Sequence, residues 1–176
     1  LESDGDSVFV WVDRSDKPYI LAINPSTGAD LWKADGLGST SWGSPRIVPV
    51  EGGNHLVCSA IGKIVGLDPN SGKRLWEFDG IANNSSNTPI PAGKGKFLIG
   101  ASEGRGEAAN GNAAENNGLV EIQKDQTNRW FAAFKWRAKK ASSSFGSPVI
   151  AGDTAAFVNR VGVLYRLDLE TGEQKY

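Results

Sequence analysis

The sequence predicts an all-β protein, a β-propeller built from four-stranded antiparallel blades, and two observations support this prediction. A short pattern that ends in an aromatic residue recurs along the chain, and a Ser/Thr-Pro pair follows it at a nearly constant distance. Trp76 follows Trp32 by 44 residues, and such a period is typical of propeller blades when the sequence has β character. We expect about four blades, forming one partial propeller domain over residues 1–176.

The repeated pattern consists of Asn or Asp, two residues, Ser or Thr, glycine, three residues and an aromatic. The Asn or Asp side chain can accept backbone N–H bonds within a turn, and the glycine supplies the left-handed residue that closes it. Three copies align without gaps, with the turn residues Asn24 and Gly28, Asp68 and Gly72, and Asp168 and Gly172. Each copy therefore predicts a tight turn that places the following aromatic at a fixed height on the last strand of a blade.

Ser/Thr-Pro pairs indicate where a new blade begins, because proline is tolerated at the first residue of a strand. The proline follows an aromatic by 12 or 13 residues in the pairs Trp32 and Pro45, Trp76 and Pro89, and Trp136 and Pro148. We predict a partial first blade at 7–33, a second at 44–78, a third with insertions at 88–139 and a fourth at 147–176. The insertions, 102–117 and 124–131, are expected to be loops that are either solvated or bind a partner.

The aromatic at the end of each repeat is predicted to pack between neighbouring blades. Alternate residues of a strand point to opposite faces, so Leu31 and Leu75 point away from the adjacent tryptophans. Burial of an aromatic side chain contributes roughly 4–6 kcal/mol as an upper estimate. The docking positions are Trp32, Trp76, Trp136 and, as a weaker substitute, Tyr176.

The pattern Asp-x-x-Ser/Thr-Gly-x-x-x-Trp with a following Ser/Thr-Pro resembles the PQQ-like repeat, and the resemblance covers essentially the whole chain. This family includes the quinoprotein alcohol dehydrogenases and the BamB-like outer-membrane assembly lipoproteins, which are eight-bladed propellers. The resemblance implies the docking role of the tryptophans and a ring of about eight blades, of which this chain is roughly half. Residues 8–12 are then the second strand of a blade whose first strand is missing. A WD40 repeat is disfavoured because no tryptophan precedes an aspartate.

The resemblance also implies what a quinoprotein enzyme needs, namely an adjacent cysteine pair, a catalytic Asp and calcium ligands. Cys58 is the only cysteine, so this chain cannot supply the disulfide. The turn already explains Asp68 and Asp168. We therefore expect no catalytic, cofactor-binding or metal site here, and PQQ and calcium only if the missing part of the ring supplies their site.

Other candidate groups have simpler structural interpretations. His55 and Cys58 fall on opposite faces of a strand and cannot form a dyad. The pair Asp4 and Asp6 lacks the longer ligand series of a calcium loop. Aromatic and basic residues alternate over 134–139, where we expect the aromatic ones to face the next blade and the basic ones to face solvent.

A net charge of −1 gives no attraction to nucleic acid, and no apolar run is long enough to span a membrane. We expect a protein-binding or scaffolding module of the BamB-like kind, with a protein partner and an extracytoplasmic location. Ring completion could come from the missing sequence or from a second chain. The alternatives are a fragment of a PQQ-dependent dehydrogenase and a carbohydrate or small-ligand binder that uses Trp11, Trp42 or Trp130.

Overall fold

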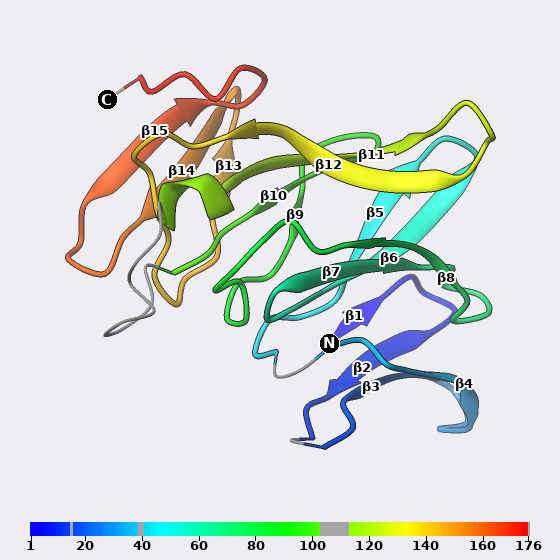
Figure 1. Ribbon diagram of the computed structural model, residues 1–176. Helices are drawn as coiled ribbons and strands as arrows, with labels where there is room; N and C mark the ends of the chain where they lie inside the picture. The colour runs from blue at the N-terminus through cyan, green and yellow to red at the C-terminus, as the bar shows by residue number, and fades with distance from the viewer. Residues whose placement is uncertain (15, 39–40, 103–112, 176) are drawn as a thin grey trace.

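Four antiparallel sheets follow one another along the chain, and each is a meander of strands that are consecutive in sequence (Figure 1). The computed structural model describes all residues except 15, 39–40, 103–112 and 176. The first sheet contains β1 (Glu2–Ser3), β2 (Val8–Val12), β3 (Tyr19–Ile23) and β4 (Asp30–Asp35), and the second contains β5 (Arg46–Val50), β6 (Gly53–Ala60), β7 (Lys63–Leu67) and β8 (Arg74–Phe78). The third contains β9 (Ile90–Pro91), β10 (Lys96–Ile99), β11 (Gly118–Lys124) and β12 (Trp130–Arg137), and the fourth contains β13 (Val149–Ala151), β14 (Thr154–Val158) and β15 (Leu164–Asp168). These sheets are propeller blades, which confirms the predicted fold class. Within the described residues, no helix is long and apolar enough to cross a membrane.

The hydrophobic core is divided into three clusters, and each lies between two neighbouring blades. Because alternate side chains leave a strand on opposite sides, one strand contributes to two of these clusters. On β6, Leu56 and Cys58 pack with the first blade, whereas Val57 packs with the third. The blades therefore associate face to face, and the second and third have both faces buried.

Turns with the same hydrogen bonds follow the third strand in three of the blades. In each, the side-chain oxygen of Asn or Asp accepts backbone N–H bonds from the residues two and three positions later. The glycine four positions later donates its N–H to the carbonyl of that Asn or Asp. The glycines are Gly28, Gly72 and Gly172, with φ of 71°, 69° and 72°.

Two tryptophans of the repeat connect one blade to the turn of the next. Trp32 on β4 donates its Nε1–H to the carbonyl of Pro69 over 2.9 Å. Its ring lies over Gly72, where an added Cβ would come within 2.5 Å of the indole. Trp136 on β12 makes the corresponding bond to the Leu169 carbonyl of the fourth blade, also over 2.9 Å. An indole is therefore held both by a hydrogen bond and by close contact with a residue that has no side chain.

The prediction that the first blade lacks its first strand, and with it the boundary at residue 7, is wrong. β1 pairs with β2, with Glu2 opposite Phe9 and Ser3 opposite Val8. The sheet thus runs from residue 2 to residue 35. The sequence carries no marker for this strand, because it has only two residues and Leu1, not a proline, precedes it.

The predicted loop at 124–131 is also wrong, because a long hairpin occupies this segment. β11 and β12 remain paired out to Lys124 and Trp130, so Trp130 belongs to a strand. The turn between them is closed by Asp125, whose Oδ1 accepts the N–H groups of Thr127 and Arg129. It contains no glycine; the left-handed residue is Asn128, with φ of 62°. The missing glycine made the turn hard to recognise.

The other predicted insertion, 102–117, is described only in part, since residues 103–112 lie outside the described residues. Its last part forms the short 3-10 helix η2 (Ala113–Asn116). Asn117 follows and is fully buried. Its Oδ1 accepts the N–H groups of Ala101 and Ser143, and its Nδ2 donates to the carbonyls of Ala101 and Ala113. This end of the segment is therefore a structural anchor.

The described part of the fourth blade has three strands, and Gln174 adds an isolated β-bridge to Leu167. Tyr176, which we assigned to the last docking position, lies outside the described residues.

Substitution of the turn glycines by alanine tests the contact with the indole. Gly28→Ala meets nothing within 4 Å and should cost only the left-handed backbone penalty, about 1–2 kcal/mol. Gly72→Ala has the same φ region but also drives a methyl group into Trp32, so we expect about 2–5 kcal/mol. Urea unfolding of both variants measures the difference in their free energy of unfolding. Equal destabilisation of the two variants would contradict a close contact between Gly72 and the Trp32 indole.

Candidate functional site

The loops of the four blades gather on two faces, because consecutive strands run in opposite directions. We call one the turn face; it carries the hairpins between the first and second strands and between the third and fourth strands. We call the other the connection face; it carries the hairpins between the second and third strands and the segments that join successive blades. The two faces differ in chemistry.

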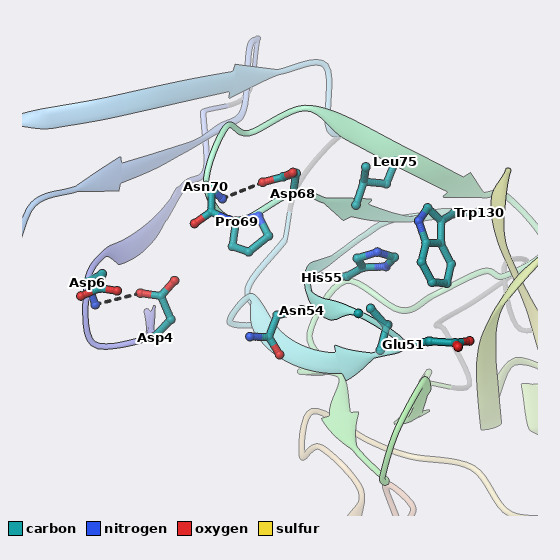
Figure 2. Close-up of a pocket in the computed structure, with 13 residues that line it drawn as sticks. Asp4, Asp6, Glu51, Asn54, His55, Asp68, Pro69, Asn70, Leu75 and Trp130 are labelled. Atoms are coloured by element: carbon teal, nitrogen blue, oxygen red, sulfur yellow. Dashed lines mark hydrogen bonds between the residues drawn. The ribbon is translucent and has the colours of Figure 1, made fainter. Parts of the chain in front are cut away.

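The turn face contains an open pocket of about 430 Å³ between the first and second blades, with Trp130 at its edge (Figure 2). Acidic side chains dominate its polar lining: Asp4, Asp6, Glu51 and Asp68. Asp4 Oδ1 accepts the N–H groups of Asp6 and Ser7, and Asp68 Oδ1 is occupied by its turn. In the described part of the chain, no three His, Cys, Asp or Glu side chains are arranged to hold a metal ion. Asp4 and Asp68 therefore organise the loops in which they lie.

His55 lines this pocket beside Trp130 and is buried (Figure 2). Its Nδ1 accepts a hydrogen bond from Trp76 Nε1–H at 3.0 Å, which leaves the ring proton on Nε2. Its ring meets that of Trp130 edge-on, with centroids 4.6 Å apart. Burial lowers the pKa of His55 to about 4, against the opposing influence of the Asp68 carboxylate. His55 is thus a neutral hydrogen-bond acceptor at neutral pH.

Trp76 occupies the predicted docking position but makes different contacts from Trp32 and Trp136. The turn of the next blade begins at Asp125, 11 residues before Trp136, whereas the corresponding distance elsewhere is eight. The longer hairpin carries the turn away from Trp76. The indole instead lies over Gly66 of its own blade, where an added Cβ would come within 2.1 Å, and stacks on Phe97 of the third blade.

Cys58 lies on the opposite face of β6 from His55 and packs in the cluster between the first two blades. It is almost completely buried, and burial raises the pKa of its thiol well above the ordinary value. The thiol is therefore protonated and out of reach of solvent. The two residues form no dyad, as the alternation of the strand indicates.

Strand β12, in which aromatic and basic residues alternate, shows the expected alternation of faces only in part. Trp136 packs toward the fourth blade, but Phe134 packs edge-on against Phe78 of the preceding blade. The expectation that both aromatic rings face the next blade is wrong, because a β-bulge beside them shifts the register of the strand by one residue. Lys135 pairs with Glu170, and Arg137 donates to the Gly80 carbonyl.

The connection face is built from three segments that bond to one another in order around the inner ends of the blades. Ser44 N–H donates to the Thr88 hydroxyl at 3.0 Å, and Thr88 N–H donates to the Ser147 hydroxyl at 2.9 Å. The Ser or Thr of the first two Ser/Thr-Pro pairs thus binds its counterpart in the next blade. The repeat predicts where these pairs lie in the chain, but not that their hydroxyl groups join the blades.

Two exposed aromatic rings meet on this face. Trp42 is 67% exposed and Phe145 is 57% exposed, and their rings stack with centroids 6.4 Å apart and planes at 29°. Trp42 was one of the tryptophans considered for ligand binding; Phe145 was missed. The signal for both is the repeated sequence Ser-aromatic-Gly-Ser-Pro, at 41–45 and at 144–148.

The other two tryptophans considered for ligand binding lie elsewhere. Trp11 is half-buried on β2 and packs against the cluster between the first two blades. Trp130 lies at the edge of the turn-face pocket, and the Lys124 ammonium group lies 4.7 Å from its ring centroid. The structure therefore brings none of the three tryptophans together.

Comparison with known proteins identifies similar sequences and structures. A model of the family described as outer membrane protein assembly factor BamB matches residues 16–175. No curated protein sequence matches. The crystal structure of BamB from Moraxella catarrhalis is 19% identical with a TM-score of 0.55, covering 100% of this chain and 62% of that one. The Cps50 (Swd1) β-propeller domain of Myceliophteria thermophila is 18% identical with a TM-score of 0.64, covering 100% of this chain and 52% of that one. The chain thus spans little more than half of either structure.

The pH dependence of stability tests the state of His55. An unfolded histidine has a pKa of about 6.5, so the unfolded chain binds the proton first when its folded-state pKa is about 4. Stability from this group is therefore complete above about pH 6.5 and is lost as the pH falls toward 4, by up to about 3 kcal/mol. His55→Gln keeps an acceptor for Trp76 without titrating. We expect urea unfolding to show that the free energy of unfolding falls less between pH 7 and pH 4.5 in the variant than in the wild type. Equal decreases would contradict this.

Proposed function

Because this chain belongs to the family of the outer membrane protein assembly factor BamB, we propose that it is part of a non-catalytic propeller that binds a protein partner outside the cytoplasm. In this proposal the repeat tryptophans hold blades together, and the loops recognise the partner. The features that support a protein partner lie on the connection face.

Large exposed apolar side chains are concentrated on the connection face. Besides the aromatic pair, Ile61 lies at the tip of the hairpin of the second blade and Val161 at that of the fourth; they are 47% and 77% exposed. Exposed apolar groups on a rigid scaffold are typical of protein contact surfaces. The turn face, by contrast, presents several carboxylates, among them Asp4, Asp68 and Asp168, that are already bonded to backbone.

We also propose that further blades, or a second chain, complete the ring. Two features of the described blades support this. Gly28 has nothing within 4 Å, although the equivalent Gly72 is covered by Trp32. On the fourth blade, Val149 and Leu164 are exposed on the face that would meet another blade. Both surfaces correspond to ones that are buried between the other blades.

Site-specific photocrosslinking in the native host tests the protein partner. A benzophenone amino acid would replace Ile61 or Val161 on the connection face, and Lys73 on the turn face as the matched control. We expect a discrete crosslinked protein, in an extracytoplasmic fraction, from the two connection-face positions only. The same pattern from Lys73, or none from Ile61 and Val161, would contradict the proposal.

Titration of the full-length parent with PQQ and calcium tests the rival dehydrogenase function. We expect no quinone absorbance to copurify and no dye-linked alcohol oxidation after addition of both. A bound quinone with alcohol-dependent dye reduction would assign the parent to the enzymes.

A further inference from the structure

We propose that Trp42 and Phe145 form a binding platform for a sugar ring of an uncharged glycan. This ligand goes beyond the protein partner of the proposed function. The inference rests on three features of the connection face: the open aromatic surface, its rigid support and the neutral groups around it.

Both rings are largely open to solvent. They come from connections that are not adjacent in the chain, yet they stack with centroids 6.4 Å apart. More than half of each side chain is exposed, so neither ring serves the core. An aromatic face is electronegative and attracts weakly positive C–H groups. The apolar face of a pyranose ring, with its axial C–H bonds, has this chemistry and a similar width.

The backbone beneath both rings is fixed to the same segment, 84–88. Trp42 N–H and Gly43 N–H donate to the Ser85 carbonyl at 2.7 and 3.3 Å. Near Phe145, the Asn87 Nδ2 donates to the Gly146 carbonyl at 2.7 Å. A platform held in this way loses little conformational freedom when a ligand binds, and such preorganisation favours affinity.

The three connection segments around the rings are polar and contain no charged side chain, although the N-terminal amino group of Leu1 donates to the Ser44 hydroxyl at 3.4 Å. The three segments 41–45, 84–88 and 141–148 contain serine, threonine and asparagine and no Asp, Glu, Lys or Arg. Among these residues, Ser44, Ser85, Ser86 and Ser144 are half-buried at the surface. Arg46 follows the first segment but is paired with Glu2 at 2.9 Å. Sugar hydroxyl groups can both donate to and accept from serine hydroxyls.

The same neutrality argues against other aromatic-stacking ligands. A quinone with carboxylate groups or a single-stranded nucleic acid would need cationic side chains beside the rings. The three segments offer none. An uncharged glycan needs none, so its binding should also be insensitive to salt.

Isothermal titration of the chain with uncharged hexasaccharides tests the platform. The probes are cellohexaose, chitohexaose and maltohexaose, with hexagalacturonate as a charged comparison. We expect at least one uncharged probe to bind, with an affinity that low and high salt leave unchanged. Trp42→Ala and Phe145→Ala should each weaken it about tenfold or more, the equivalent of about 1.4 kcal/mol of lost contact. Trp42→Phe should retain most of the affinity.

The matched control is Ile61→Ala, which removes an exposed apolar group from the same face and should leave glycan binding unchanged. Circular dichroism and urea unfolding show whether the variants keep the fold; saturation-transfer NMR on the wild-type chain shows independently whether sugar C–H protons contact aromatic protons. Failure of all three uncharged probes to bind would overturn the proposal. So would equal affinity in wild type and both alanine variants. Either result leaves the photocrosslinking test of the protein partner unaffected.

Discussion

The arrangement of the blades depends on the contact between an indole and the turn glycine of the next blade. Trp32 can lie against Gly72 because no Cβ stands between the ring and the backbone, and its N–H is then directed at the Pro69 carbonyl. The hydrogen bond fixes the orientation of the indole, and the close approach fixes the distance between the two sheets. The apolar cluster between the first two blades packs at that distance. Trp136 makes the same contact two blades later.

The sequence was sufficient to predict this architecture because the repeat encodes it locally. The turn is specified by one Asn or Asp and one glycine, and the position of the aromatic follows from the turn. The same reasoning failed where the local sequence carries no such marker. β1 has two residues and no preceding proline, and the turn at Asp125 uses Asn128 in place of glycine. Both elements are stabilised by pairing with neighbouring strands. Such pairing cannot be predicted from a short sequence pattern.

Trp76 shows how a change in one blade alters the contacts of another. The lengthened hairpin of the third blade removes the turn that Trp76 would otherwise meet, so its N–H requires another acceptor. His55 supplies one, and Gly66 provides the space that Ala22 and Leu119 occupy at the equivalent positions. A neutral histidine is required for this bond, and burial keeps His55 neutral despite the nearby Asp68 carboxylate. The sequence contains His55, Gly66 and Trp76 but does not indicate that they contact one another.

The regular spacing of the sequence repeat explains why the turn face and the connection face differ in what they can bind. On the turn face, the Asn or Asp side chain of each repeated turn is bonded to the backbone of its own turn. On the connection face, bonds from backbone N–H groups to side-chain hydroxyls pass from one blade to the next, from Ser44 through Thr88 to Ser147. Side chains between these anchors are free to project outward, and equivalent positions in successive connections are drawn toward one another. Trp42 and Phe145, at equivalent positions of two connections, meet in this way. A repeat whose first requirement is stability thereby brings together two aromatic residues that are 103 positions apart in the chain.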